Sequence, residues 1–161
     1  MEKKKKTKVL FISSTGGHLS EMLRLSPMFE KYDYHIITEK TKSNLSLGDK
    51  YPGKVDYLVY GTKKNFLVYP FKLLYNTFKS LFFYLKFRPK VIITTGTHTA
   101  GPMCIIGKIF GSKIIYIETL ANMKTKTATG RIIYHFADLF VVQWEGMLKL
   151  YPKAKYWGMI Y

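Results

Sequence analysis

Cysteine is nearly absent from this sequence of 161 residues, since Cys104 is the only one. A single cysteine excludes an internal disulfide framework and any zinc site built from several cysteines, and it suits a reducing compartment. Acidic residues are also scarce, because 26 lysines and arginines face 10 aspartates and glutamates, a formal net charge of +16. This excess predicts attraction to nucleic acid, anionic lipid or a phosphorylated substrate.

Long uninterrupted apolar runs are missing as well. The start, with Lys3–Lys6, resembles the basic region of a secretion signal, but the apolar stretch Val9–Ile12 behind it is too short to complete one. We therefore predict no secretion signal and interpret residues 1–7 as a basic tail, either solvated or in contact with an anionic membrane. Hydrophobic residues make up 47% of the chain, which supports one core, and the length is too short for two ordinary domains.

Short β-branched stretches alternate with helical ones along the chain. Most of the apolar stretches are continuous, which is typical of strands covered on both faces in a parallel sheet. We expect strands at Lys8–Ile12, Tyr34–Thr38, Val55–Val59, Val91–Thr95, Lys113–Ile117 and Leu139–Val142. We expect helices at about Leu19–Lys31, Pro70–Phe87, Gly101–Phe110 and Gly130–Phe136. This order predicts a single doubly wound α/β domain over residues 1–161, with a mostly parallel, Rossmann-like sheet.

Two glycine-rich stretches, Ser13–His18 and Thr94–Pro102, follow predicted strands and precede predicted helices. Glycine permits tight turns and close backbone approach, and a helix start offers N–H groups to an anion. Ligands of doubly wound sheets bind beyond the carboxyl ends of strands, so these glycine loops are expected to line one crevice. Neither loop matches a dinucleotide or P-loop fingerprint, which counts against a simple NAD domain, and either one alone fits a plain turn.

Residues 66–88 are unusually rich in aromatic and apolar side chains. Lys72, Lys79 and Lys86 recur every seven residues and therefore share one face of the predicted helix, which Pro70 begins. Three lysines argue against a membrane-spanning helix, whereas a helix lying in the membrane interface fits. The predicted membrane-binding residues are Lys72, Phe78, Lys79, Leu81, Phe82, Leu85 and Lys86. The alternative is an ordinary crossover helix, packed on the sheet with its lysines in water.

With these features in hand, the sequence resembles the asparagine-linked-glycosylation "fourteen" family and its bacterial counterparts in capsule and exopolysaccharide synthesis. These proteins are similar to the N-terminal half of MurG, a peptidoglycan glycosyltransferase of the GT-B architecture. The resemblance covers nearly the whole chain. It is carried by Ser14–His18, Thr95–Pro102, Ile117-Glu118, Thr129–Tyr134, Ala137–Trp144 and Tyr151–Gly158.

The resemblance implies the acceptor-binding, membrane-docking subunit of a two-component inverting glycosyltransferase in polysaccharide biosynthesis. A sugar would pass from a UDP-sugar to a polyprenyl-diphosphate-linked acceptor at the cytoplasmic face of the plasma membrane. A separate GT-B C-terminal-half subunit would bind the UDP-sugar, so this chain alone is expected to be inactive. No cofactor and no metal are expected. Eukaryotic members carry an N-terminal transmembrane helix that this sequence lacks, which leaves the mode of membrane attachment open.

Inverting sugar transfer needs a base for the acceptor hydroxyl and positive charge or N–H dipoles near the diphosphate. By similarity to MurG, His18 is the candidate base or the group that orients the acceptor phosphate. Glu118 follows an apolar strand at the end that points toward the crevice, and is a candidate second acid/base or a hydrogen-bond partner of a sugar hydroxyl. The alternatives are a histidine that only caps the loop and a carboxylate that caps a helix or joins a salt bridge. The expected acceptor- and phosphate-binding residues are Thr15, Gly16, Gly17, Gly96, Thr97, His98 and Thr99.

Two other functions compete with this interpretation. A stand-alone nucleotide-binding α/β protein would need a phosphate signature with an acidic ribose contact, and the sequence has neither. A nucleic-acid-binding module would need clustered basic and aromatic residues with a recognisable motif, which is also missing. We therefore prefer the glycosyltransferase subunit and expect no nucleic-acid partner.

Overall fold

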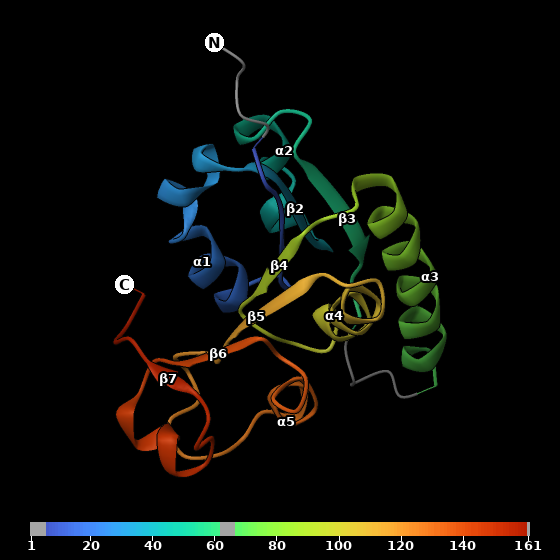
Figure 1. The fold of residues 1–161 in the computed structure, drawn as a ribbon. Coiled ribbons are helices and arrows are strands. Elements are labelled where there is room, and N and C mark those ends of the chain that lie inside the picture. The colour runs from blue at the N-terminus through green and yellow to red at the C-terminus, as the bar shows by residue number, and fades with distance from the viewer. Residues whose placement is uncertain (1–5, 62–66, 161) are drawn as a thin grey trace.

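The computed structural model describes residues 6–61 and 67–160, in which seven parallel strands form one sheet with helices on both faces (Figure 1). Most of the predicted basic tail and Phe66 lie outside the described residues. The strands are β1 (Lys8–Ile12), β2 (Asp33–Lys40), β3 (Val55–Val59), β4 (Val91–Thr94), β5 (Lys113–Ile117), β6 (Leu139–Val142) and β7 (Lys155–Tyr156). Their order in the sheet is β3-β2-β1-β4-β5-β6-β7, which confirms the doubly wound α/β prediction.

Strand β1 shows why continuous apolar runs form this sheet. Its side chains alternate between the two faces, so that Leu10 and Ile12 join one hydrophobic core while Val9 and Phe11 join the other. The helices that cover the first core are α3 (Tyr69–Phe87), α4 (Ala100–Ile109) and α5 (Ala128–Ile133). The second core lies under α1 (Gly17–Leu23), α2 (Leu47–Lys50) and the 3-10 helix Ser26–Lys31.

The single helix predicted over Leu19–Lys31 is wrong in its second half. Helix α1 ends at Leu23 and a 3-10 helix begins at Ser26, with Pro27 in its first turn. Proline has no N–H to donate to the preceding turn, so an α-helix does not continue through it. Strand β7, helix α2 and the 3-10 helices Lys42–Asn44 and Glu145–Lys149 were not predicted either, because such short elements carry no measurable periodicity.

The winding direction of the sheet reverses between β1 and β4. The chain proceeds from β1 through β2 to β3 on one side, then crosses back through α3 and proceeds from β4 to β7 on the other. The carboxyl ends of β1 and β4 are therefore neighbours, with Ile12 paired to Thr94. This topology places the two glycine loops side by side at the switch point, where doubly wound sheets bind their ligands.

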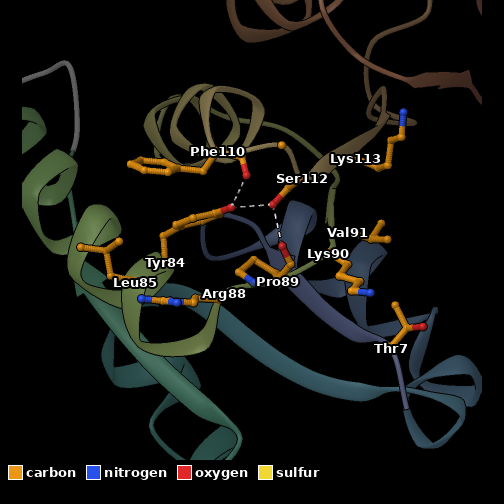
Figure 2. A pocket seen from close by; sticks show the side chains of 11 residues that line it. Thr7, Tyr84, Leu85, Arg88, Pro89, Lys90, Val91, Phe110, Ser112 and Lys113 are labelled. Carbon is orange, nitrogen blue, oxygen red and sulfur yellow. Dashed lines mark hydrogen bonds between the residues drawn. The ribbon is translucent and has the colours of Figure 1, made fainter. Parts of the chain in front are cut away.

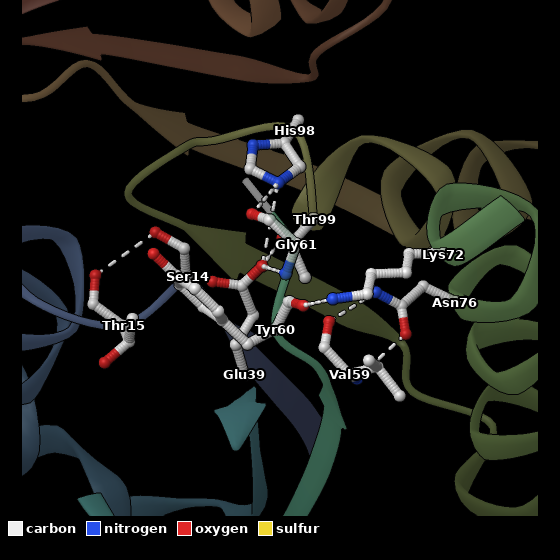
Figure 3. A network of polar contacts seen from close by, with 10 residues as sticks. All are labelled: Ser14, Thr15, Glu39, Val59, Tyr60, Gly61, Lys72, Asn76, His98 and Thr99. Atoms are coloured by element: carbon white, nitrogen blue, oxygen red, sulfur yellow. Dashed lines mark hydrogen bonds and ion pairs between the residues drawn. The ribbon is translucent and has the colours of Figure 1, made fainter. Parts of the chain in front are cut away.

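Helix α3 closes the outer edge of the sheet with a buried asparagine. The Asn76 side chain accepts a hydrogen bond from the Val59 N–H at 2.9 Å and donates one to the Val59 carbonyl at 2.8 Å (Figure 3). Next to it, Lys72 Nζ donates to the Tyr60 carbonyl at 3.1 Å. An amide that pairs with both backbone groups of an edge strand takes the place of a further strand.

We expect Asn76→Ala to lower the free energy of unfolding by about 2–4 kcal/mol, because it deletes two hydrogen bonds and leaves backbone groups of Val59 unpaired. Urea denaturation followed by circular dichroism measures the change. Phe78→Ala is the matched control, since Phe78 is 66% exposed on the same helix and its loss should cost at most about 0.5 kcal/mol. Equal costs for the two variants would contradict the role given to Asn76.

Candidate functional site

The two glycine loops meet at the carboxyl edge of the sheet. The His18 ring nitrogen Nδ1 lies 2.8 Å from the Thr95 carbonyl oxygen, and the Thr95 hydroxyl donates to the His18 carbonyl at 2.7 Å. These two hydrogen bonds join the start of α1 to the loop that follows β4. The predicted candidates on the two loops therefore share one surface.

The contact with Thr95 decides which nitrogen of His18 carries the proton. A carbonyl oxygen only accepts hydrogen bonds, so Nδ1 is the N–H donor and, in the neutral ring, Nε2 keeps its lone pair. His18 is half-buried, so the ring is held by the fold while part of it stays accessible. A fixed imidazole with an unprotonated nitrogen can accept a proton from an attacking hydroxyl.

Backbone beside His18 is open to a ligand. A side-chain carbon placed on Gly16 or Gly17 would meet no other atom within 4 Å. Gly16 has φ +74°, which glycine adopts without strain. Thr15, just before it, is held by its hydroxyl, which lies 3.1 Å from that of Thr41 in the turn after β2.

The loop after β4 contains two consecutive residues with positive φ, Gly96 at +99° and Thr97 at +82°. Glycine is required at position 96 because a Cβ there would lie 2.7 Å from the Tyr116 hydroxyl oxygen. A β-branched residue such as Thr97 in this conformation costs on the order of 1–3 kcal/mol. Within the described residues, the buried Thr97 hydroxyl also has no hydrogen-bond partner. Strain and an unsatisfied hydroxyl at one residue are typical of a ligand site.

Glu39 is a site residue that the sequence analysis missed. It ends β2 with 1% exposure, and its Oε1 accepts a hydrogen bond from the Thr99 hydroxyl at 2.6 Å (Figure 3). The same oxygen lies 3.4 Å from the Gly61 N–H and 3.6 Å from His98 Nε2. The Glu39 carboxylate, at the end of β2, therefore fixes the positions of the predicted loop residues Thr99 and His98.

His98 is held as part of this network. Its Nε2 lies 3.2 Å from the Gly61 carbonyl, and its ring contacts the Tyr69 ring edge-on at 5.3 Å. Because both neighbours of Nε2 are acceptors, that nitrogen carries the hydrogen and Nδ1 keeps the lone pair. The imidazole links the loop after β4 to the first residue of α3 while 30% of the side chain stays exposed. These contacts fit a residue that shapes the site.

A second buried glutamate supports the loop that follows β5. Glu21 on α1 is 3% exposed, and its Oε1 accepts hydrogen bonds from the Thr119 hydroxyl and the Leu120 N–H, both at 2.9 Å. Glu21, Glu39 and Glu118 are thus three of only ten acidic residues in the chain, and all three are buried next to the candidate site. The sequence does contain a signal for each of these residues. Glu39 is a lone glutamate within an apolar strand, and Glu21 is a lone glutamate on the apolar face of a helix.

Glu118 is also inside the protein. It is 1% exposed, and its carboxylate accepts hydrogen bonds from the Tyr151 hydroxyl at 2.8 Å and the Thr127 hydroxyl at 3.0 Å. Thr127 is the N-cap residue of α5 and accepts from the Gly130 N–H at 3.0 Å. These contacts fit the structural alternative, a carboxylate that supports a helix cap. We propose no catalytic role for it.

Burial raises the pKa of the Glu118 carboxyl, although hydrogen bonds from Tyr151 and Thr127 act in the opposite direction. A carboxyl with a raised pKa in the folded state holds its proton more tightly than in the unfolded chain. The stability that it contributes is therefore present below the unfolded pKa and is lost as the pH rises through the folded pKa. We expect the free energy of unfolding of the unsubstituted protein, relative to Glu118→Gln, to fall across that window.

Urea denaturation of both proteins at a series of pH values measures this difference. Comparing the two proteins removes the contributions of all other titrating groups. A difference that does not change with pH, or that grows as the pH rises, would show that the carboxyl is not protonated preferentially in the folded state.

No three or more His, Cys, Asp or Glu side chains in the described part of the chain are gathered to hold a metal ion. The expectation from the sequence that no metal is needed stays a prediction. The thiol of Cys104 is fully buried, and burial raises its pKa to about 12. It is therefore not a reactive nucleophile.

Helix α3 turns its aromatic face outward. The residues that face the sheet are Asn76, Ser80, Phe83 and Tyr84. The opposite side is an outer strip of exposed side chains formed by Phe71, Leu74, Tyr75, Phe78, Phe82 and Leu85. An ordinary crossover helix would bury its apolar side chains and expose polar ones, so the strip requires another explanation.

The lysines predicted to share one face lie along the border of the outer strip. Lys79 Nζ is 5.7 Å from the centre of the Phe83 ring, and Lys86 Nζ is 3.9 Å from the Asp56 carboxylate. Leu81, which was predicted to contact the membrane, is half-buried and does not belong to the strip. Across residues 6–61 and 67–160, no helix has the length and apolar character needed to cross a bilayer.

Residues 62–160 match the family model described as "Oligosaccharide biosynthesis protein Alg14 like". The chain is 30% identical over 191 residues to the UDP-N-acetylglucosamine transferase subunit ALG14 of Kluyveromyces lactis. This match covers 96% of this chain and 79% of the yeast protein. It is 26% identical over 177 residues to the human subunit of the same name, covering 94% of this chain and 82% of the human protein.

Solved structures of similar fold include MurG from Acinetobacter baumannii, with a TM-score of 0.69 and 16% identity. The match covers 87% of this chain and 42% of that enzyme. UDP-N-acetylglucosamine 2-epimerase from Rickettsia bellii gives a TM-score of 0.70 at 14% identity, covering 96% of this chain and 45% of the epimerase. The chain thus spans less than half the length of these enzymes, and at such low identity the likeness shows the fold alone.

Proposed function

Because this chain belongs to the Alg14-like family of oligosaccharide biosynthesis proteins, we propose that it is the acceptor-binding subunit of a two-component inverting glycosyltransferase. The donor is a UDP-sugar that a second, GT-B C-terminal-half subunit binds, and the acceptor is a polyprenyl-diphosphate-linked sugar. The reaction takes place at the cytoplasmic face of the plasma membrane in polysaccharide biosynthesis.

The observation that carries this proposal is the fixed ring of His18. Its Nδ1–H is held by the Thr95 carbonyl. None of the described residues binds its Nε2, which can therefore take the proton of the acceptor hydroxyl as that oxygen attacks the anomeric carbon. The bare backbone of Gly16 and Gly17 lies on the same surface and allows close approach of the acceptor diphosphate.

Membrane docking follows from the outer strip of α3. Its six exposed apolar side chains, bordered by lysines, suit a helix that lies in the interface, with rings among the acyl chains and amines near phosphates. A net charge of +16 favours an anionic lipid surface. The first residue of α3, Tyr69, contacts His98, so a docked α3 would hold the candidate site beside a lipid-linked acceptor.

The second subunit has a suitable surface at the other end of the sheet. Strand β7 has two residues and pairs with β6 only, so among the described strands its outer edge is unpaired. Trp157 and Met159 follow it and are 67% and 52% exposed. Large exposed apolar side chains beside an open sheet edge are typical of a protein–protein interface.

Reconstitution tests the proposed function. The purified chain, a candidate GT-B C-terminal-half protein and their mixture are each assayed for transfer from a UDP-sugar to a lipid-linked acceptor. We expect transfer only from the mixture. Turnover by this chain alone would overturn the split site and favour the competing interpretation, a stand-alone nucleotide-binding enzyme.

A further inference from the structure

A cavity of about 810 Å³ opens at the amino edge of the sheet, opposite the glycine loops (Figure 2). Its walls come from the ends of α3 and α4 and from the starts of β4 and β5. A second hollow of about 290 Å³ adjoins it, because Thr7, Arg88 and Lys90 line both. Neither hollow takes part in the chemistry proposed above.

Buried hydroxyl groups make the floor of the cavity rigid. The Tyr84 and Ser112 hydroxyl oxygens lie 2.9 Å apart, and the Ser112 hydroxyl donates to the Pro89 carbonyl at 2.6 Å (Figure 2). Helix α3 ends beside this floor at Phe87, and its C-cap residue Arg88 has the left-handed backbone conformation (φ +51°). The shape of the cavity therefore follows from the packing of α3 against α4.

The rim is cationic. The residues that line the two hollows include Lys6, Lys8, Arg88, Lys90 and Lys113, and no acidic residue. Lys113 pairs with Asp138 at 3.0 Å, and Lys8 donates to the Phe87 carbonyl at 2.9 Å. Arg88 and Lys90 form no ion pair with any carboxylate of the described residues. Two cations without a counter-charge beside a hollow favour an anionic ligand.

One wall of the cavity is apolar and continuous with the outer strip. Leu85 belongs to both, and Phe110, 56% exposed, also lines the cavity. A ligand that satisfies this cavity therefore has an anionic head and an apolar chain. A free phosphate ester or a nucleic acid would neutralise the rim but leave the apolar wall and the strip in water.

We propose that this cavity binds the phosphate headgroup of an acidic phospholipid, with Arg88 and Lys90 on the phosphate and the acyl chain along Leu85 and Phe110. The inference rests on the proposed membrane docking and adds a lipid-specific site to it. Helix α3 has 19 residues and is therefore about 28 Å long. A headgroup bound at its end and the candidate site at its start would fix how the subunit is rotated on the bilayer.

Vesicle co-sedimentation tests the site. Binding of the full chain is compared between pure phosphatidylcholine vesicles and vesicles that also contain phosphatidylglycerol. We expect Arg88→Gln with Lys90→Gln to weaken binding to the anionic vesicles by about 30-fold, since each cation near an anionic surface contributes about a fivefold factor. Binding to phosphatidylcholine should not change. The matched control removes two exposed lysines far from α3, Lys149→Gln with Lys153→Gln, and should weaken anionic binding by less than about threefold.

Several outcomes would overturn the inference. Equal losses in the two double variants would mean that net charge alone acts. Thermal melting checks that the Arg88/Lys90 variant is folded. If this folded variant still binds anionic vesicles as tightly as the unsubstituted protein, the cavity is not a lipid site. Membrane docking would still stand in that case, provided that variants of the outer strip lose vesicle binding. Displacement from anionic vesicles by glycerol 3-phosphate or by a short DNA duplex, at concentrations matched in phosphate, would assign the cavity to a soluble anion or to nucleic acid.

Discussion

Replacing His18 by alanine should lower kcat of the assembled two-subunit transferase by roughly 100- to 10,000-fold, the range that a lost general base accounts for. The structure gives the reason, since the Thr95 carbonyl holds Nδ1 as a donor and directs the lone pair of Nε2 away from that bond. The expected loss is in the chemical step, so KM for the UDP-sugar should change little. Steady-state kinetics of the reconstituted enzyme measure both constants.

Two further variants separate catalysis from structure. His18→Asn keeps a donor for the Thr95 carbonyl but supplies no base, so it should be about as inactive as the alanine variant. His135→Ala is the matched control, because His135 is an exposed histidine after α5 and its loss should leave kcat unchanged. Recovery of activity in the asparagine variant would reduce His18 to a residue that only joins the two glycine loops.

The double variant Phe78→Ser with Phe82→Ser should bind vesicles roughly 100-fold less tightly than the unsubstituted protein. These rings are 66% and 61% exposed at the middle of the outer strip. Each phenylalanine transferred from water into an apolar phase gains about 1.5–3 kcal/mol at most, so even partial insertion of two rings accounts for such a factor. Co-sedimentation with lipid vesicles measures the change, and thermal melting should show an unaltered fold.

The control for this prediction is Leu45→Ser, which removes an apolar side chain of 49% exposure outside α3, between the 3-10 helix Lys42–Asn44 and α2. Its vesicle binding should match that of the unsubstituted protein. If Phe78 and Phe82 can be replaced without loss of binding, the outer strip is not the docking surface, and a protein partner is then its more fitting occupant.

The strands could be predicted from the sequence because they are buried on both faces. A continuous apolar run such as Lys8–Ile12 suits a strand in the interior of a parallel sheet, where both faces are covered. Because β1 and β4 are adjacent and parallel in the sheet, the loops that follow them are neighbours. The hydrogen bonds between His18 and Thr95 are the observed result. Topology thus gave the location of the candidate site before any side chain was placed.

The contacts inside that site could not be predicted in the same way. Glu39 lies 60 positions from Thr99, and nothing in its local sequence specifies that the two side chains meet at 2.6 Å. Glu118 follows an apolar strand and was expected near the ligand, but Thr127 and Tyr151 surround it inside the protein. Such roles depend on loop conformations that hydrophobic periodicity does not encode.

The orientation of helix α3 on the sheet could not be predicted from the sequence. Its length and its row of lysines were predictable, but both faces contain aromatic residues, so periodicity alone did not say which one the sheet covers. The contact of Asn76 with Val59 settles the orientation and turns Phe78 and Phe82 outward. One buried polar side chain thus decides which surface is available for a membrane.

Ligand binding by the isolated chain is the most direct test of whether this lobe holds the acceptor. Isothermal titration calorimetry with a short-chain polyprenyl-diphosphate-linked sugar should show binding that Gly17→Val abolishes and Gly146→Val, at an equally open glycine elsewhere, preserves. A UDP-sugar should give no heat of binding with the same protein. Binding of the UDP-sugar without binding of the acceptor would contradict the assignment of this lobe.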